Sequence, residues 1–173
     1  ESACRELDCP FLACRGYTSQ SEMWRAGKRI REHAENGQPT VILHLGDHDP
    51  SGIDMSRDIE DRLKMFIGRD LEDELTVDRI ALNLDQIKKY NPPPNPAKSS
   101  DCRFDDYRRR FGNESWELDA LEPAALVKLV REKVKKLTAP KAWRKAVALQ
   151  ESERSFLSAV ADKWDSVCEF LDQ

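Results

Sequence analysis

VILHLGDHDPSGIDMSRDI, from Val41 to Ile59, is the stretch that decides the fold class of this chain. Its first residues are β-branched and apolar, which predicts a strand from Thr40 to Leu45 that is buried on both faces, as in parallel sheets. Asp47 and Asp49 follow directly, and residues two apart in an extended backbone point the same way. Ligands of open α/β sheets bind beyond the carboxyl ends of the strands. Both carboxylates are therefore expected to reach one binding site.

The acidic pair predicts a site for a hard divalent cation. Two carboxylates held close together repel each other unless a cation lies between them. Mg²⁺ prefers oxygen ligands and keeps water molecules that a phosphate substrate can replace. The other interpretation is a solvated acidic loop in which Asp49 only caps the next helix. The apolar strand before Asp47 and the turn of Pro50, Ser51 and Gly52 favour the cation site.

Strands and helices alternate along residues 11–136, which predicts an α/β fold with a mostly parallel sheet flanked by helices. Ser19 and Glu22 match the pattern of a capping box, which starts a helix over residues 21–35. Further strands are predicted at residues 11–15, 76–82 and 115–121, and further helices at residues 84–90 and from Pro123. We expect an α/β domain over residues 1–138, followed by a C-terminal helical extension over residues 139–173.

The segment DHDPSG, at residues 47–52, resembles the D-x-D motif of Toprim domains. It looks like the DGDPYG type found in the topoisomerase VI A subunit and its meiotic relatives. A longer pattern, RGYTSQSE…GDHDPSG…RIAL…PPNPAK…WELDAL, is similar to Toprim-like proteins of phages and bacteria. The resemblance implies a Rossmann-like α/β fold that binds Mg²⁺, or Mn²⁺, for phosphoryl transfer on nucleic acid. Asp47 and Asp49 would then be catalytic metal ligands, and DNA cleavage would be the simplest activity.

The family pattern also includes a glutamate that follows an earlier strand. Glu1 is the first candidate, but few residues separate it from the strand predicted at residues 11–15. That spacing leaves no room for the intervening helix. We therefore expect the family's glutamate, and the first strand of the domain, to lie upstream of Glu1 in a longer parent protein.

A second acidic pair, Glu117 and Asp119, repeats the two-residue spacing at the end of a strand that is predicted to begin at Ser115 and that precedes a helix. In nucleases of the Toprim family, carboxylates late in the domain can hold a second ion. Two ions about 4 Å apart stabilise the attacking and leaving oxygens together. The resemblance therefore makes Glu117 and Asp119 candidate catalytic metal ligands. In the other interpretation, Asp119 caps the following helix and Glu117 pairs with an arginine.

Two histidines lie close to the first acidic pair. His48, between the aspartates, is expected to point away from them, either in a structural role or toward a phosphate. His44, in the middle of the predicted strand, is expected to be buried with its hydrogen bonds satisfied.

Nucleic-acid contacts are expected from the basic segment after a proline-rich loop, because a net charge of −4 offers DNA no bulk attraction. Guanidinium groups match phosphate oxygens, and a tyrosine such as Tyr107 can stack on bases. Interleaved aspartates allow a second interpretation, a solvated surface of salt bridges. Ser19 can contact phosphate or cap a helix. The candidates for nucleic-acid binding are Lys98, Arg103, Arg108, Arg109 and Ser19.

Composition bears on compartment and partners. The longest apolar runs are too short to span a bilayer, and no signal-peptide pattern is present. Five cysteines without a CxxC pair predict reduced, mostly buried thiols in a cytoplasmic protein. Apolar residues at helical spacing from Trp143 to Leu171 predict a helical segment through which two copies could form a homodimer.

Three functions are consistent with this sequence. The leading one is Mg²⁺-dependent cleavage of DNA, with RNA as the other substrate class. The second is a topoisomerase-like or primase-like enzyme whose attacking hydroxyl comes from further domains of the parent chain. The third is a Toprim-like module that binds DNA or assembles a complex without catalysis.

Overall fold

The structure, a computed structural model, describes residues 2–14 and 16–171. The chain divides into two compact units, Glu1–Arg131 and Glu132–Gln173. Within the described residues the fold is mixed α/β, mainly helical, with one parallel sheet of two strands. The α/β class predicted from the sequence is therefore confirmed, although the sheet is much smaller than expected.

The first unit carries both β-ladders and the acidic turn. Strands β1 (Thr40–Leu45) and β2 (Leu75–Ala81) pair in parallel, with His44 opposite Arg79. Strands β3 (Asn95–Pro96) and β4 (Glu114–Ser115) form a short antiparallel pair. The helical elements of this unit are α1 (Ser2–Glu6), α2 (Gln20–Glu35), α3 (Pro50–Ile67), α4 (Leu84–Tyr90), α5 (Phe104–Phe111), the 3-10 turns η1 (Glu72–Glu74) and η2 (Leu118–Ala120), and the start of α6 (Pro123–Leu137).

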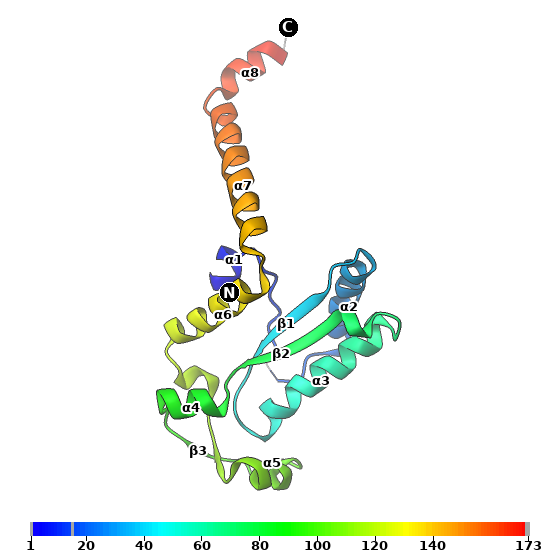
Figure 1. Cartoon of the computed structure of the whole chain (residues 1–173), viewed down its shortest axis with the longest axis vertical. Coiled ribbons are helices and arrows are strands. Elements are labelled where there is room, and N and C mark those ends of the chain that lie inside the picture. Colours follow the sequence, from blue (N-terminus) through cyan, green and yellow to red (C-terminus); the bar gives the residue numbers. More distant parts are fainter. Residues whose placement is uncertain (1, 15, 172–173) are drawn as a thin grey trace. The chain divides into compact units, whose positions relative to one another are not determined.

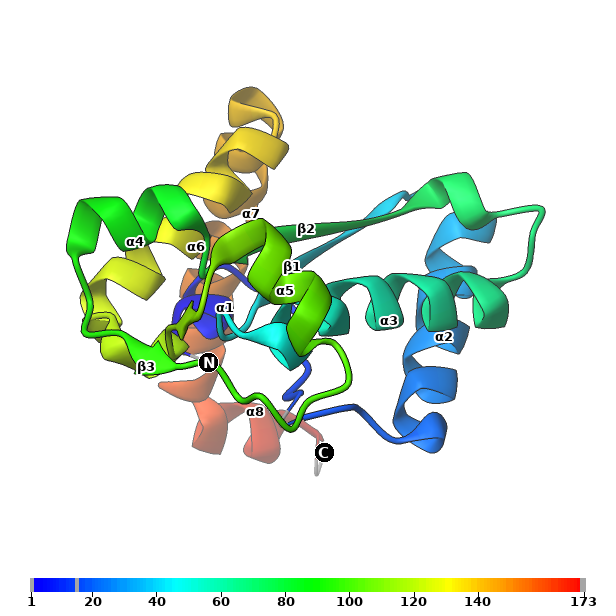
Figure 2. The ribbon, with the colours of Figure 1, turned by 90° about the horizontal axis from the view of Figure 1, so that it is seen from below.

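The first hydrophobic core lies between the β1–β2 pair and the helices α2 and α3. Leu63 and Ile67 of α3 are 0% exposed, and Leu75 brings β2 into the same cluster. Figures 1 and 2 show α3 running alongside the two strands, with α2 next to α3. Gly27 of α2 permits this close packing, because a Cβ added there would lie 2.6 Å from the Cβ of Phe66.

The strand β1 is well buried on one face only. Ile42 packs against the first core and His44 is 6% exposed, whereas Val41, which points to the opposite face, is 38% exposed. The expectation of a strand buried on both faces is therefore wrong. The reason is that the core formed with α2 and α3 lies against a single face of the pair.

A second hydrophobic cluster forms beyond the carboxyl ends of β1 and β2. Its buried members are Leu82, Ile87, Trp116 and Leu121, which come from two separate stretches of the chain. Figure 1 shows α4, β3 and α5 gathered at this end of the strands. This cluster fixes the position of the chain segments that follow the sheet, including the segment with the second acidic pair.

Several predicted elements agree with the structure. The helix predicted at residues 21–35 is α2, the strand predicted at residues 76–82 is β2, and the helix predicted at residues 84–90 is α4. The cysteines are free thiols, as expected. Four of them are half-buried and Cys102 is exposed, so the expectation of mostly buried thiols is wrong.

Two predicted strands are missing or truncated. Residues 11–14 form no strand, and Phe11 and Leu12 are 55% and 40% exposed. The segment at residues 115–121 enters the fold as the last residue of β4 and then turns into η2. An apolar run becomes a strand only where a neighbouring strand satisfies its backbone groups, and no described strand pairs with residues 11–14. The expected parallel sheet is thus reduced to one pair.

The second unit is helical in its described residues. It contains the end of α6, then α7 (Pro140–Ala161) and α8 (Trp164–Leu171), so the helical prediction for residues 143–171 is confirmed, with a break at residues 162–163. None of the described residues of this unit is buried. No described helix combines the length and the apolarity that crossing a bilayer requires.

Candidate metal site at the acidic turn

Asp49 begins α3. Its backbone is extended, with φ −137° and ψ 173°, and its Oδ1 accepts a hydrogen bond of 2.6 Å from the amide of Gly52. The hydroxyl of Ser51 lies 3.2 Å from the same oxygen. Gly52 is required because an added Cβ would lie 2.3 Å from the carbonyl oxygen of Asp47. The helix-capping role considered for Asp49 is therefore present, and it occupies one of the two carboxylate oxygens.

Asp47 joins the acidic turn to the second acidic segment. Its Oδ1 accepts a hydrogen bond of 2.7 Å from the amide of Leu118, which lies 71 positions later in the chain. Leu118 is the first residue of η2, and its two neighbours are Glu117 and Asp119. The two acidic pairs predicted from the sequence are therefore brought together at one edge of the first unit.

Glu117 and Asp119 are both exposed. Neither side chain forms a hydrogen bond or an ion pair with any residue that the structure describes. The helix cap considered for Asp119 and the arginine pair considered for Glu117 are thus not seen within the described ranges. Both carboxylates remain able to bind a cation from solution.

Arg79 of β2 lies behind the acidic turn and fixes its backbone. Its guanidinium donates to the carbonyl oxygens of Gly46 at 2.8 Å, Asp47 at 2.6 Å and Gly52 at 2.8 Å. Burial lowers the pKa of Arg79, and the negative charges of Asp47 and Asp49 oppose that shift. Because Arg79 binds carbonyl oxygens, neither carboxylate is taken up by an ion pair to any described residue.

His44 lies beside Arg79 on the inner face of β1. Its ring is buried, and Nδ1 lies 2.8 Å from the hydroxyl of Ser56 on α3. Burial, with a further contribution from the charge of Arg79, lowers the pKa of His44 to about 4. The expectation of a buried, satisfied histidine is confirmed, and the imidazole is neutral near pH 7.

His48 points away from the carboxylates into a cluster of aromatic rings. Its ring centroid lies 4.8 Å from that of Phe111 and 5.7 Å from those of Tyr107 and Trp116. Nδ1 lies 2.8 Å from the hydroxyl of Tyr107, and the backbone of His48 pairs with Trp116 in both directions. His48 is 2% exposed and Tyr107 is 3% exposed. His48 is therefore structural, and the base stacking expected of Tyr107 is wrong because its ring is buried.

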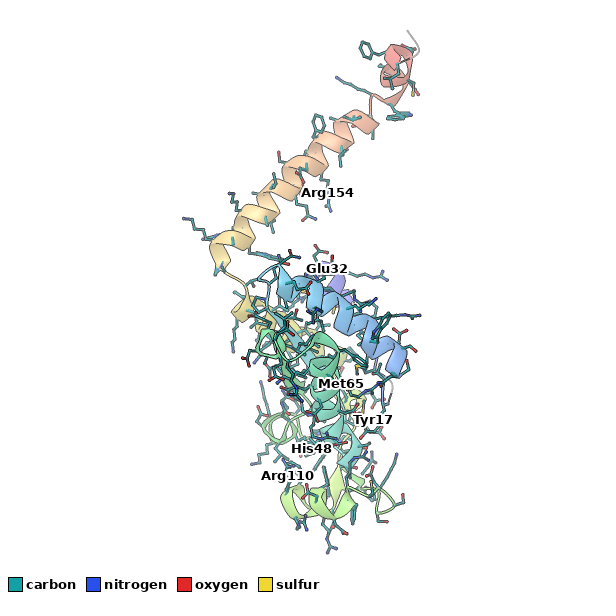
Figure 3. The ribbon with its side chains drawn as sticks, turned by 90° about the vertical axis from the view of Figure 1, so that its right-hand side faces the viewer. Tyr17, Glu32, His48, Met65, Arg110 and Arg154 are labelled. Atoms are coloured by element: carbon teal, nitrogen blue, oxygen red, sulfur yellow. The ribbon has the colours of Figure 1, made fainter. Side chains whose placement is uncertain are left out.

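Asp54, in the first turns of α3, ties three segments together. It accepts hydrogen bonds from Arg57 at 2.8 Å, from the hydroxyl of Tyr17 at 2.7 Å and from Arg103 at 2.9 Å (Tyr17 is labelled in Figure 3). These bonds, led by that from Arg57, lower the pKa of Asp54 to about 2. Burial and the bond to Asp54 raise the pKa of Tyr17 to about 12. Arg103 also pairs with Asp101 at 3.1 Å, so its guanidinium is part of the fold.

The other candidates for nucleic-acid binding divide into two groups. Ser19 caps α2 through a hydrogen bond of 3.2 Å from a first-turn amide, and Arg109 pairs with Asp106 at 2.9 Å. Lys98 and Arg108 are exposed and form no interaction with any described side chain. These two residues are the candidates whose charges are available to a phosphate.

The donor set of the acidic turn fits a hard cation in its chemistry. Carboxylate oxygens are the ligands that Mg²⁺ uses, commonly one or two in number, with water molecules completing the shell. Among the described residues no three acidic, histidine or cysteine side chains are grouped closely enough to hold a metal by themselves. Asp47 and Asp49 would therefore provide two ligands at most in the arrangement described, with Glu117 and Asp119 nearby.

Sequence reasoning missed two residues that organise this site. Arg79 follows Leu75 and Val77 at every second position of β2, and this alternation already indicates that its side chain points inward. Asp54 gives no such signal, because its partners Tyr17 and Arg103 lie 37 and 49 positions away.

No protein-family model, curated protein or solved structure matches this chain. The α/β class is therefore supported by the structure, whereas the Toprim resemblance depends on the motif at residues 47–52 and the pattern around it.

Proposed function

We propose that this chain is a Toprim-like module that takes part in Mg²⁺-dependent phosphoryl transfer on nucleic acid, most simply the cleavage of DNA. The observation that carries the proposal is the hydrogen bond between Asp47 and the amide of Leu118, because it brings both acidic pairs to one edge. That edge lies beyond the carboxyl end of β1, where ligands of α/β sheets bind. A Rossmann-like Toprim fold and a cytoplasmic location belong to the same proposal, and the free thiols agree with that location.

In this proposal Asp47 and Asp49 hold the first ion, while Glu117 and Asp119 support a second. Each aspartate uses Oδ1 for a backbone amide, so its Oδ2 is the oxygen that would bind a cation, and Oδ2 of Asp49 also lies 3.4 Å from the hydroxyl of Ser51. Bound Mg²⁺, or Mn²⁺, would polarise a phosphate and lower the pKa of an attacking water. Arg79 already holds the backbone of the turn, so the carboxylates lose little conformational entropy when they bind an ion.

The nucleic-acid partner is proposed to be DNA, with RNA as the other class to test. Lys98 and Arg108 offer exposed positive charge to the phosphate backbone. Arg103, Arg109 and Ser19 would first have to leave the partners they have in the fold. Contacts of this kind depend on counterion release, so binding should weaken as salt is raised.

Two measurements test the proposal. The first is binding of Mn²⁺ by calorimetry, in which Asp47→Asn together with Asp49→Asn should abolish the heat of binding. Asparagine keeps an oxygen that can accept the amide hydrogen bonds, so the fold is retained while the charge is lost. Asp85→Asn, on an exposed acid in the first turn of α4, is the matched control and should bind like the wild type. Equal Mn²⁺ binding by all variants would contradict the proposal.

The second measurement is cleavage of supercoiled plasmid by the chain, with Mg²⁺ or Mn²⁺. Asp47→Asn should reduce the rate by about 100-fold or more, as expected for loss of a residue that stabilises transition-state charge. The Asp85→Asn control should cleave at the rate of the wild type. Cleavage that is unaffected by Asp47→Asn would place the active site elsewhere.

A second candidate function is a module that binds DNA or assembles a complex without catalysis. It is favoured by the use of Asp49 as a helix cap and by the absence, among the described residues, of a group of three metal ligands. This function predicts DNA binding that needs no divalent cation and that survives Asp47→Asn. A topoisomerase-like or primase-like enzyme would instead need an attacking hydroxyl supplied by another protein segment or a nucleotide.

A further inference from the structure

The helix α7 presents a large apolar side that its own unit does not bury. It runs for 22 residues, and none of the described residues of the second unit is buried. Figure 3 shows side chains standing clear of this helix, Arg154 among them. The exposed fractions of its large apolar side chains are 38% for Trp143, 45% for Val147, 58% for Leu149, 70% for Phe156 and 65% for Leu157.

These residues form one side of the helix. At 100° per residue, Trp143, Val147 and Leu157 lie within about a quarter turn of each other, and Leu149 and Phe156 extend the same side. Ala148 and Ser155 lie on the opposite side, whereas Ser152 lies beside Phe156 and Leu157. Glu153 and Arg154 interrupt this side. Soluble proteins nevertheless rarely leave so many large apolar side chains exposed on one side of a helix, and such surfaces mark interaction sites.

The charges along the second unit are arranged in two blocks. The first half of α7 contains Lys141, Arg144 and Lys145 and no acidic residue. From residue 150 onward acidic residues outnumber basic ones. The acidic residues of this part are Glu151, Glu153, Asp162, Asp165, Glu169 and Asp172.

We propose that two copies of this chain pair through the apolar side of α7 in antiparallel orientation. Antiparallel pairing lays the basic half of each helix along the acidic part of its partner, whereas parallel pairing would put the two basic halves together. With the two-fold axis near Gln150, Trp143 of one copy packs beside the partner's Leu157. The inference is independent of the proposed function, because it uses no residue of the acidic turn.

The pairing is tested by sedimentation of the full chain over a range of concentrations. The wild type should form dimers as concentration rises, and Phe156→Glu combined with Leu157→Glu should weaken dimer formation by at least about tenfold. Ala148→Glu combined with Ser155→Glu adds the same charge on the opposite side and should leave the dimer intact. Circular dichroism of each variant checks that α7 remains helical. A wild type that stays monomeric at every concentration reached would overturn the proposal.

Charge reversal tests the orientation. One variant carries Arg144→Glu and Lys145→Glu, and the other carries Glu151→Lys and Glu153→Lys. In an antiparallel dimer each variant alone brings like charges together and associates more weakly than the wild type, while an equimolar mixture recovers wild-type affinity. In a parallel dimer each variant would match the wild type and the mixture would bind more tightly, which would overturn the antiparallel arrangement.

The basic half of α7 could instead serve nucleic acid, and the same variants separate the two outcomes. If Arg144→Glu with Lys145→Glu abolishes DNA binding while the wild type remains monomeric, the basic block is a nucleic-acid contact and the pairing proposal fails. If the reversal weakens the dimer and leaves DNA binding unchanged, the pairing proposal is supported.

Discussion

The carbonyl oxygen of Asp47 accepts a hydrogen bond of 2.6 Å from the guanidinium of Arg79, so a half-buried cation holds the acidic turn through its backbone. The same guanidinium donates to the carbonyl oxygens of Gly46 and Gly52, which lie on either side of the turn. Arg79 thus stabilises the backbone of the turn without forming an ion pair with Asp47 or Asp49, so both carboxylates remain available to a metal ion.

Replacing Arg79 should destabilise the fold strongly. Arg79→Met keeps the apolar stem but leaves several carbonyl oxygens without a donor, and unsatisfied buried groups cost about 1–3 kcal/mol each before any solvent enters. We expect a loss of roughly 3 kcal/mol in the free energy of unfolding, measured by urea denaturation. Arg108→Met, at an exposed arginine, should change this free energy by less than about 0.5 kcal/mol. Similar values for the two variants would contradict the supporting role of Arg79.

Asp49 should show separable effects on stability and on metal binding. Asp49→Ala removes the acceptor for the Gly52 amide and should cost about 1 kcal/mol in unfolding free energy. Asp49→Asn keeps an acceptor and should be nearly as stable as the wild type, yet it should bind Mn²⁺ as poorly as the alanine variant. Calorimetry and urea denaturation of both variants measure the two properties. Retained Mn²⁺ binding in Asp49→Asn would show that the residue only caps α3.

His44 should make the fold less stable in mild acid. Burial holds its folded-state pKa at about 4, below the ordinary value of 6.5, so only the unfolded chain takes up a proton between these values. Stability from this group is complete above pH 6.5 and falls as the pH is lowered toward 4, by up to about 3 kcal/mol. His44→Gln should lack this loss when unfolding free energies at pH 7 and pH 4.5 are compared. His33→Gln, at an exposed histidine of α2, is the control and should behave like the wild type.

Asp54 should contribute stability that disappears in stronger acid. Its pKa is about 2 in the fold against an ordinary value of 3.8, so its contribution is present above pH 3.8 and is lost as the pH falls through 2. The shift corresponds to about 2 kcal/mol. Urea denaturation at pH 5 and pH 2 should show a smaller acid loss for Asp54→Asn than for the wild type. Asp61→Asn, at an exposed acid that also pairs with Arg57, should retain the wild-type loss.

Local parts of the fold and the site could be predicted from the sequence. The acidic turn follows a β-branched run and leads into a helix through Pro50, and each of these signals is contained within a few residues. The capping role of Asp49 is local in the same way, because its acceptor and the Gly52 amide are three residues apart. Contacts of this range are fixed by backbone geometry and side-chain chemistry.

Long-range parts could not be predicted, because they depend on which segments meet in the folded chain. The hydrogen bond between Asp47 and Leu118 spans 71 positions, and no pattern around either residue specifies it. The apolar run at residues 11–14 resembles a strand locally, but whether it forms one depends on a pairing edge supplied by another segment. The burial of Tyr107 against His48 likewise follows from the meeting of α5 with the turn.

His48, the residue between the two aspartates, is anchored by its backbone to Trp116 and by its ring to Tyr107. The backbone between Asp47 and Asp49 therefore has little freedom to adjust the separation of the two carboxylates around a bound cation. A rigid binding site discriminates between cations by ionic radius. Mg²⁺ needs ligand oxygens at about 2.1 Å, whereas Ca²⁺ needs a larger number of oxygens at about 2.4 Å. If the proposed ion binds at this turn, its size selectivity would be set through the backbone by the buried imidazole of His48.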